Sequence, residues 1–407
     1  MGTILRLAWR NIWRNRRRSL ISIASVLFAV LAAMLMRSMQ LGFYGRSIDN
    51  VVSFFTGYLQ IHAPGYWELQ TLDKSLELSD SLTACVLRTR GVTCVAPRLE
   101  SFELVSGGRL TEGAMVVGMD PEAENRMIRL KNKLSGGEYL RPVDNRILLA
   151  EGLASHLGLG VGDTAVLFGQ GYHGILAAGK YPVAGTVRYP VPDLNNGLAI
   201  LPLEQAQVLF GAEGRITSLA VTVDGPKRLS SVLSDLKKRF GQRVEILSWE
   251  EMMPELVQAI QTDNAGGLIM IFILYMVIAF GILGTVLMMT LERTREFGVL
   301  MAVGMKRGIL RAVILIESVL LSIIGTAAGI LASLPVILYL HVHPLRLHGR
   351  GAEATLNYGF EPIFPFSTDP SIFLNQACVV LAIAILASVY PLWRISRMDP
   401  VISLRSG

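Results

Sequence analysis

Residues 291–310, LERTREFGVLMAVGMKRGIL, decide how the rest of this chain must be read. They join two apolar runs, 266–290 and 309–340, which each exceed the ~20 residues that a helix needs to span a bilayer. Ionised groups are costly inside hydrocarbon, so this charged connector must lie on a membrane face. The cytoplasmic face is favoured by the basic residues in and directly after the connector: Arg293, Arg295, Lys306, Arg307 and Arg311. A short charged helix held there is suited to docking a soluble partner.

The composition is that of a membrane protein. Hydrophobic residues make up 51% of the chain and charged residues 17%, whereas soluble domains have about 25% charged residues. In a soluble chain, the net charge of +6 would suggest nucleic acid or an anionic surface as a partner. Here the basic residues gather at the ends of the apolar runs, so membrane topology explains them and nucleic-acid binding is not expected. The three cysteines have no CxxC or Cys/His spacing that would indicate a zinc or redox motif.

Four membrane spans are predicted. The first is preceded by six arginines within residues 1–18, and it is too long for a signal peptide and lacks a cleavage site, so it indicates an uncleaved anchor. Basic residues also follow the fourth span, which puts both termini in the cytoplasm. The expected order is a cytoplasmic amphipathic elbow helix (1–18), a first span (19–41), an exterior domain (42–265), a second span (266–291), a cytoplasmic connector helix (292–308), a third span (309–340), a short exterior loop (341–371), a fourth span (372–392) and a cytoplasmic tail (393–407).

The exterior domain shows a mixed pattern of strands and helices. Alternating or β-branched runs predict strands at 58–62, 92–97, 114–117, 165–168, 183–187 and 219–223. Polar-capped segments predict helices at 79–89, 151–157, 202–210 and 226–240. The predicted fold class is therefore a membrane α-helical protein with four transmembrane helices and a large α+β periplasmic domain inserted between helices 1 and 2.

The connector resembles the coupling helix of the FtsX/MacB-type ABC transporter permeases. The residues that carry this resemblance are Glu292, Arg295, Glu296, Phe297, Gly298, Val303 and Gly304. The third span matches the same family at Glu317, Gly325 and Gly329. The elbow 7–18 also resembles the family, as does the tail at Pro391, Trp393, Arg394, Ser396, Arg397, Asp399, Pro400, Leu404 and Arg405. The resemblance therefore extends from one end of the chain to the other.

Within that family, the exterior domain looks most like that of the lipoprotein-releasing (Lol-type) permeases. The similar segments are 117–124 (VGMDPEAE), 147–163 and 203–210. In those relatives a hairpin grips a lipoprotein carrier, and here the corresponding segment 168–180 is rich in glycine and lacks proline. The glycines predict a mobile, exposed loop. Tyr172 and Ile175 could anchor a soluble partner there, and an unemployed connection is an equal alternative.

No ATP-binding loop is present in the sequence. There is no G-x-x-x-x-G-K-[ST] run to cradle phosphates, and the segment 134–138, LSGGE, is expected to be a Gly-Gly turn rather than a nucleotide element. The chain is therefore not expected to be an enzyme or to bind a cofactor. The resemblance implies that ATP and Mg²⁺ are bound by a partner ABC ATPase in two copies.

The resemblance implies a transport function in the bacterial inner membrane. Two copies of the permease, or this chain with a close homologue, would extract lipoprotein or other amphipathic cargo from the outer leaflet, among membrane lipids, and pass it to a periplasmic carrier or adaptor. Three alternatives remain open. They are a MacB-like efflux permease, an FtsX-like regulator of a periplasmic hydrolase, and a membrane enzyme whose catalytic domain is 42–265.

Several single features allow two interpretations. Glu317 either pairs with connector arginines or takes part in coupling, and Gly325 and Gly329 form either a close contact between spans or a dimer seam. Arg37 is expected to reach the membrane interface, with a lipid headgroup or cargo as the alternative. Cys85 and Cys94 could form a disulfide or remain buried thiols. His341, His343 and His348 are read as an interfacial loop rather than a metal site.

Overall fold

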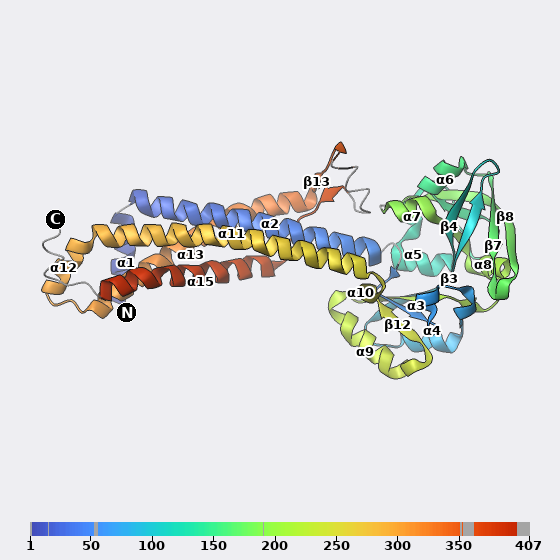
Figure 1. Ribbon diagram of the computed structural model, residues 1–407, viewed down its shortest axis with the longest axis horizontal. Coiled ribbons are helices and arrows are strands. Elements are labelled where there is room, and N and C mark those ends of the chain that lie inside the picture. The colour runs from blue at the N-terminus through green and yellow to red at the C-terminus, as the bar shows by residue number, and fades with distance from the viewer. Residues whose placement is uncertain are drawn as a thin grey trace. The chain divides into compact units, whose positions relative to one another are not determined.

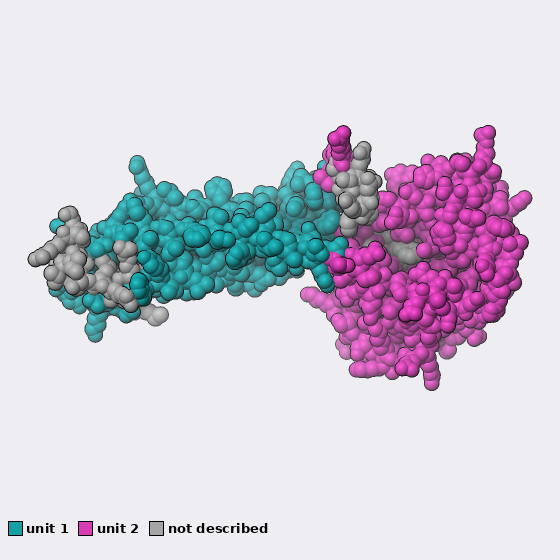
Figure 2. Space-filling model, in the orientation of Figure 1, with its two compact units in different colours: residues 1–45, 259–346, 363–407 teal, residues 46–258, 347–362 magenta. Residues whose placement is uncertain are grey.

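The computed structural model describes residues 2–14, 16–52, 56–189, 191–350, 352 and 362–396. The chain forms two compact units (Figure 2). Unit 1 combines residues 1–45, 259–346 and 363–407, and unit 2 combines residues 46–258 and 347–362. Unit 1 is built of long helices, and unit 2 is a mixed α and β domain.

Within the described part of the chain, four helices are long and apolar enough to cross a membrane. They are α2 (Arg16–Val51), α11 (Pro254–Glu292), α13 (Arg307–Val342) and α15 (Pro370–Ser396). They run side by side in Figure 1. The other elements among the described residues of this unit are α1 (Gly2–Arg14), α12 (Thr294–Ala302), β13 (Leu345–Arg346) and β14 (Ile363–Phe364). Even α15, with 27 residues, is longer than the ~30 Å hydrocarbon core at 1.5 Å per residue.

Some helix limits differ from those expected. The elbow helix ends at Arg14 and α2 begins at Arg16, so the arginines 16–18 belong to the long helix. The connector helix is shorter than 292–308, because Gly304 has φ +102 and ends the helical path. The tail residues Arg397, Asp399, Pro400, Leu404 and Arg405 lie outside the described residues.

Unit 2 contains one large sheet whose central strands are buried. Its strand order is β12-β1-β11-β3-β4-β9-β6-β8-β5, and β7 pairs with β3 and β8. The strands are β1 (Leu59–His62), β3 (Val92–Ser106), β4 (Thr111–Met119), β5 (Leu134–Gly137), β6 (Ile147–Ala150), β7 (Thr164–Gln170), β8 (Leu176–Val187), β9 (Leu198–Pro202), β11 (Ser218–Val223) and β12 (Glu245–Ser248). A two-stranded sheet pairs β2 (Leu76–Glu77) with β10 (Arg215–Ile216). The burial of β6, β9 and β11 along nearly their whole length explains their continuous apolar sequences.

Short helices connect and cover these strands (Figure 1). They are α3 (Tyr66–Leu69), α4 (Asp80–Leu87), α5 (Pro121–Ile128), α6 (Glu151–Leu157), α7 (Pro192–Gly197), α8 (Leu203–Phe210), α9 (Leu229–Phe240) and α10 (Trp249–Met252). The amphipathic stripe of α9 buries Val232 and Leu236, as its helical spacing predicts. Every strand and helix predicted for this domain has a counterpart in unit 2, although several strands are longer than predicted.

Two predictions for unit 2 are wrong. The expected Gly-Gly turn at 134–138 is the edge strand β5, antiparallel to β8, with a register shift between Leu134 and Gly136. The expected mobile loop 168–180 is mostly paired strand, because Gly169 faces Ala177 and Gly179 faces Leu167 across the β7–β8 hairpin. Glycine lowers strand propensity, but the surrounding ladder overrides this local preference.

Candidate functional site

The connector helix α12 has one face buried in unit 1. Phe297 is 4% exposed and belongs to the same core cluster as Ile12 of α1 and Ile314 of α13. Gly298, next to it, is also buried. These two predicted coupling residues therefore attach the connector to the helices around it and leave the opposite face outward.

Gly304 closes α12 with a defined hydrogen-bond pattern. The Met305 N–H donates to the Leu300 carbonyl at 2.9 Å, and the Gly304 N–H donates to the Met301 carbonyl at 3.0 Å. This pair of bonds is the Schellman motif, which requires a positive φ at the residue after the cap. The role of Gly304 is therefore to stop the helix and redirect the chain into α13.

A buried ion pair ties the connector to the third long helix. Arg293 Nη1 lies 3.1 and 3.2 Å from the two carboxylate oxygens of Glu317, and both side chains are less than 10% exposed. Arg293 Nη2 also donates to the Asn11 carbonyl of α1 at 3.3 Å. One guanidinium thus joins α1, α12 and α13, and Glu317 pairs with a connector arginine, which is the first of its two interpretations.

Two further predicted coupling residues contact the basic N-terminal segment. Glu296 forms an ion pair with Arg14 at 2.5 Å, and Glu292 forms one with Arg18 of α2. Both pairs are partly or fully solvent-exposed, so each contributes little to stability. Their geometric effect is to hold the N-terminal arginines against the connector.

The outward face of α12 is apolar with a basic residue beside it. Val299, Leu300 and Val303 are exposed, Val303 to 83%, and Arg295 is exposed next to them. We call Val299, Leu300 and Val303 the connector patch. Val303 was predicted from the sequence, whereas Val299 and Leu300 were not, although their helical spacing relative to Phe297 and Gly298 indicates an outward position.

Gly325 and Gly329 form a contact within the chain. A Cβ atom at Gly325 would lie 2.7 Å from Val26 Cβ, and one at Gly329 would lie 2.8 Å from Val30 Cγ1. These distances are below van der Waals contact, so α2 and α13 approach as closely as they do only because both positions lack a side chain. Of the two roles considered for this pair, close helix packing is the one that the contacts support.

Polar side chains of α2 and α11 form a cluster that the sequence analysis did not foresee. Arg37 Nη1 donates to Gln40 Oε1 at 2.7 Å and to Asn264 Oδ1 at 2.8 Å, so its guanidinium is bonded within the protein. Tyr44 Oη donates to Asp263 Oδ2 at 2.5 Å. These bonds join the two helices where their sequences leave the apolar runs.

A largely apolar pocket of about 470 Å³ lies beside that cluster. Its lining residues are Met36, Met39, Gln40, Phe43, Asp263, Gly266, Gly267, Met270 and Phe364. The three methionines provide flexible, polarizable walls that adapt to apolar ligands of different shape.

In unit 2, the segment VGMDPEAE has a structural explanation. Asp120 caps α5 by accepting hydrogen bonds from the N–H groups of Glu122 and Ala123 at 2.9 and 3.2 Å. Glu124 forms a fully buried pair with Arg98 of β3, with Nε to Oε1 at 2.5 Å and Nη2 to Oε2 at 3.0 Å. The motif therefore starts a helix and fixes it to the sheet.

The β7–β8 hairpin places Tyr172 and Ile175 in the same tight turn. Tyr172 is half-buried against the core of unit 2, and the Arg215 guanidinium carbon lies 4.9 Å from its ring centre. Ile175 is 46% exposed. Tyr172 is thus packed inward, whereas Ile175 is partly exposed and partly packed over Gly211 at the end of α8.

The cysteines and histidines do not form a redox or metal site in the described part of the chain. Cys85, Cys94 and Cys378 are free thiols, and no group of metal-ligating side chains gathers among the described residues. His341 Nδ1 is 2.6 Å from the Phe366 carbonyl, a contact within unit 1.

Comparison with known proteins gives three kinds of similarity. Residues 268–400 match the model of the FtsX-like permease C-terminal family. The lipoprotein-releasing system transmembrane protein LolC of Xylella fastidiosa is 26% identical over 77% of this chain and 78% of its own length, and that of Neisseria meningitidis is 22% identical over 95% and 94%. The macrolide export protein MacB of Escherichia coli is 28% identical over 49% of this chain and 28% of its own length. Among solved structures, the periplasmic region of MacB from Actinobacillus actinomycetemcomitans covers 49% of this chain and 92% of its own, at 15% identity and a TM-score of 0.35.

Proposed function

Since this chain is an ABC transporter permease of the FtsX-like type that includes LolC and MacB, we propose that it couples ATP hydrolysis by a separate ATPase subunit to the extraction of an amphipathic cargo from the outer leaflet of the bacterial inner membrane. Unit 2 then lies in the periplasm, and two permease chains act with two ATPases. Lipoprotein is the cargo class that the full-length similarity to LolC favours.

The observation that carries this proposal is the two-sided connector helix. One side of α12 is fixed to α1 and α13 through Phe297 and Arg293, and the other presents the connector patch. A partner that binds the patch and moves can therefore displace the long helices as well. Buried apolar residues at such a contact contribute more to affinity than the exposed charges around it.

The coupling step is tested by Leu300→Lys in the complex formed with the co-expressed ATPase. We expect weaker assembly or loss of cargo-stimulated ATP hydrolysis, because a charge would enter an apolar contact. Leu300→Met is the matched control and is expected to behave as the wild type. Normal assembly and normal coupling in Leu300→Lys would contradict the proposal. The purified chain without its partner is expected not to hydrolyse ATP.

The pocket between α2 and α11 is the proposed cargo-binding region. Its volume of about 470 Å³ and its methionine-rich wall suit acyl chains. We expect Met270→Trp, which fills the pocket, to reduce cargo release without preventing assembly with the ATPase. Parallel release assays with an acylated lipoprotein and with an amphipathic drug distinguish lipoprotein release from MacB-like efflux.

A further inference from the structure

The N-terminal half of strand β3 in unit 2 is paired with another strand on one side only. β3 pairs with β11 over Val92–Arg98 on one side. On its other side β3 pairs with β4 only from Arg98 onward, where Arg98 faces Met119. Within the described part of the chain, residues 93–97 of β3 therefore have no strand on the side away from β11.

The register determines which main-chain groups face that free side. Val95 lies opposite Val221, whose carbonyl accepts a hydrogen bond from the Tyr58 N–H at 3.0 Å on the β1 side. Opposite residues in an antiparallel ladder exchange both hydrogen bonds or neither, so the N–H and C=O of Val95 point away from β11. Pro97, two residues later, has the same orientation, and a proline without an N–H is typical of such an edge.

The neighbouring residues fit this interpretation. The register shifts between Thr222 and Val223, which leaves Thr93 as the extra residue of a β-bulge. The Val95 carbonyl is approached by the Cys94 thiol, a weak donor, at 3.7 Å. No hydrogen-bond acceptor for the Val95 N–H is found among the described residues, although Val95 is only 6% exposed. This N–H faces the cleft lined by Val95, so it is free to donate to an external acceptor.

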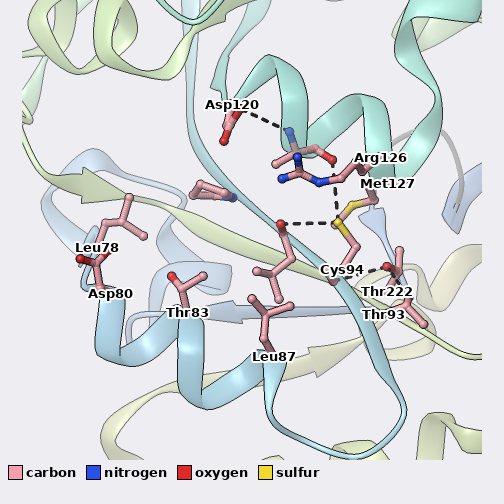
Figure 3. A pocket seen from close by; sticks show the side chains of 13 residues that line it. Leu78, Asp80, Thr83, Leu87, Thr93, Cys94, Asp120, Arg126, Met127 and Thr222 are labelled. Carbon is pink, nitrogen blue, oxygen red and sulfur yellow. Dashed lines mark hydrogen bonds between the residues drawn. The ribbon is translucent and has the colours of Figure 1, made fainter.

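The free edge forms one wall of a cleft of about 550 Å³ (Figure 3). Thr83 and Leu87 of α4 line one side, and Arg126 and Met127 of α5 line the other, with Cys94 between them. The volume lies within the range of pockets that enclose ligands. The Asp120 carboxylate in the same cleft is already engaged by the first turn of α5, so it does not compete for the strand edge.

We propose that this cleft binds an extended peptide segment of a partner protein, which adds to β3 as a short strand alongside Thr93–Pro97. Addition of a strand uses main-chain hydrogen bonds for affinity and side-chain pockets for selectivity. The segment accepts a hydrogen bond from the Val95 N–H and donates one to the Val95 carbonyl. Its inward side chains meet Leu87 and Met127, so small or aliphatic residues are favoured at those positions. This inference does not depend on the proposed transport function.

The test uses the full chain in nanodiscs and a displayed library of random heptapeptides, with empty nanodiscs as the background. Peptides that are enriched are then measured by fluorescence anisotropy. Val95→Pro removes the edge N–H without removing a hydrogen bond to β11, and we expect about tenfold weaker binding. Val95→Ala keeps the N–H and is the matched control, with an expected loss below about threefold. Methylation of alternate peptide nitrogens is expected to abolish binding at one set of positions and spare the other.

A second variant tests the cleft independently, in case Val95→Pro does not fold. Thr83→Trp fills the cleft from α4 and leaves β3 intact, so it should also prevent peptide binding while thermal unfolding stays like that of the wild type. In a Cys85→Ser, Cys378→Ser background, bound peptide is expected to slow maleimide labelling of Cys94. The proposal is overturned if no peptide is enriched above background, or if binding is unaffected by Thr83→Trp and by nitrogen methylation.

Discussion

The guanidinium of Arg293, at the start of the connector helix, lies 3.1 Å from the carboxylate of Glu317 in α13, and this pair is buried. A buried ion pair is not a strong source of net stability, but removal of one partner leaves an uncompensated charge in a low-dielectric environment. The pair therefore acts as a fixed link between the connector and a long helix, and this link is where motion of one would reach the other.

Glu317→Ala is expected to lower the free energy of unfolding by about 3–5 kcal/mol, because Arg293 would remain buried without its partner. Glu296→Ala, which breaks the exposed pair with Arg14, is the control and is expected to cost less than about 1 kcal/mol. The double variant Arg293→Leu, Glu317→Leu should recover much of the stability and lose coupling. Thermal unfolding in detergent and ATPase assays of the complex measure the two effects. Equal destabilisation by Glu317→Ala and Glu296→Ala would contradict this account.

Gly325→Ala is expected to destabilise unit 1 by pushing α13 away from α2, because its Cβ would meet Val26 at 2.7 Å. Gly284→Ala is the matched control in α11, since a Cβ there meets nothing within 4 Å. Alanine favours helix over glycine by about 1 kcal/mol, so the control should be neutral or stabilising. The measurement is the melting temperature of each variant relative to the wild type. A higher melting temperature for Gly325→Ala would exclude close packing of α13 against α2 as the role of Gly325.

Gly304→Leu is expected to weaken coupling, because leucine at φ +102 is strained and the Schellman turn would open. Glu296→Lys is expected to weaken coupling by a different route, since the new charge would face Arg14. Both variants should still insert into the membrane. Assembly with the ATPase and cargo-stimulated turnover are the measurements, and Gly304→Asn, which tolerates positive φ better, is the control for the first variant.

The lowered pKa of Lys133 in unit 2 is expected to make the free energy of unfolding depend on pH. Burial lowers the pKa of its ammonium group to about 7, with Glu124 opposing and Arg98 adding to the shift. The unfolded chain, with an ordinary lysine pKa of about 10.4, then binds more protons than the folded chain between these two values. Stability from this group should therefore increase as the pH rises from about 7 toward 10.

The matching experiment compares pH profiles of thermal unfolding for Lys133→Met and Lys131→Met in the full chain. We expect the first variant to lose part of the rise seen in the wild type and the exposed-site control Lys131→Met to keep it. Identical profiles for Lys133→Met and the wild type would show that this lysine is not the source.

The β7–β8 hairpin can be tested as a docking site by a point substitution at its tip. Deletion of the segment between Gly169 and Gly179 is not suitable, because both glycines lie in paired strands and their loss would disrupt the sheet. Ile175→Asp changes the tip of the hairpin and its contact with Gly211 and leaves the paired strands unchanged. If a carrier or adaptor docks there, this variant is expected to reduce cargo handover and spare assembly with the ATPase. Tyr172→Phe, which keeps the inward packing, is the control. Full handover by Ile175→Asp would exclude the tip as a docking site.

Local sequence patterns predicted the elements of this protein well. The alternating runs became strands β1, β3, β4, β7, β8 and β11. The family resemblance based on the connector and the third span agrees with the FtsX-like match over 268–400, and the N-terminal elbow lies outside that match. Patterns of this kind depend on neighbours along the chain, so they can be read without the fold. The prediction of a loop at 168–180 was wrong because strand pairing is a property of two segments, and the glycine content of one does not decide it.

The sequence by itself determined the four apolar runs and the charged connector, because hydrophobic length and charge act locally, whereas the end of the connector helix at Gly304 was not predicted from it. Only the tertiary structure decided that Glu292 pairs with Arg18 and Glu296 with Arg14. The same holds for the packing of Val26 against Gly325. It also decided that the outward face of the connector is the apolar patch and that Val95 lies on a free strand edge. These features depend on which distant segments pack together, and the chain specifies that only through the sum of many weak contacts.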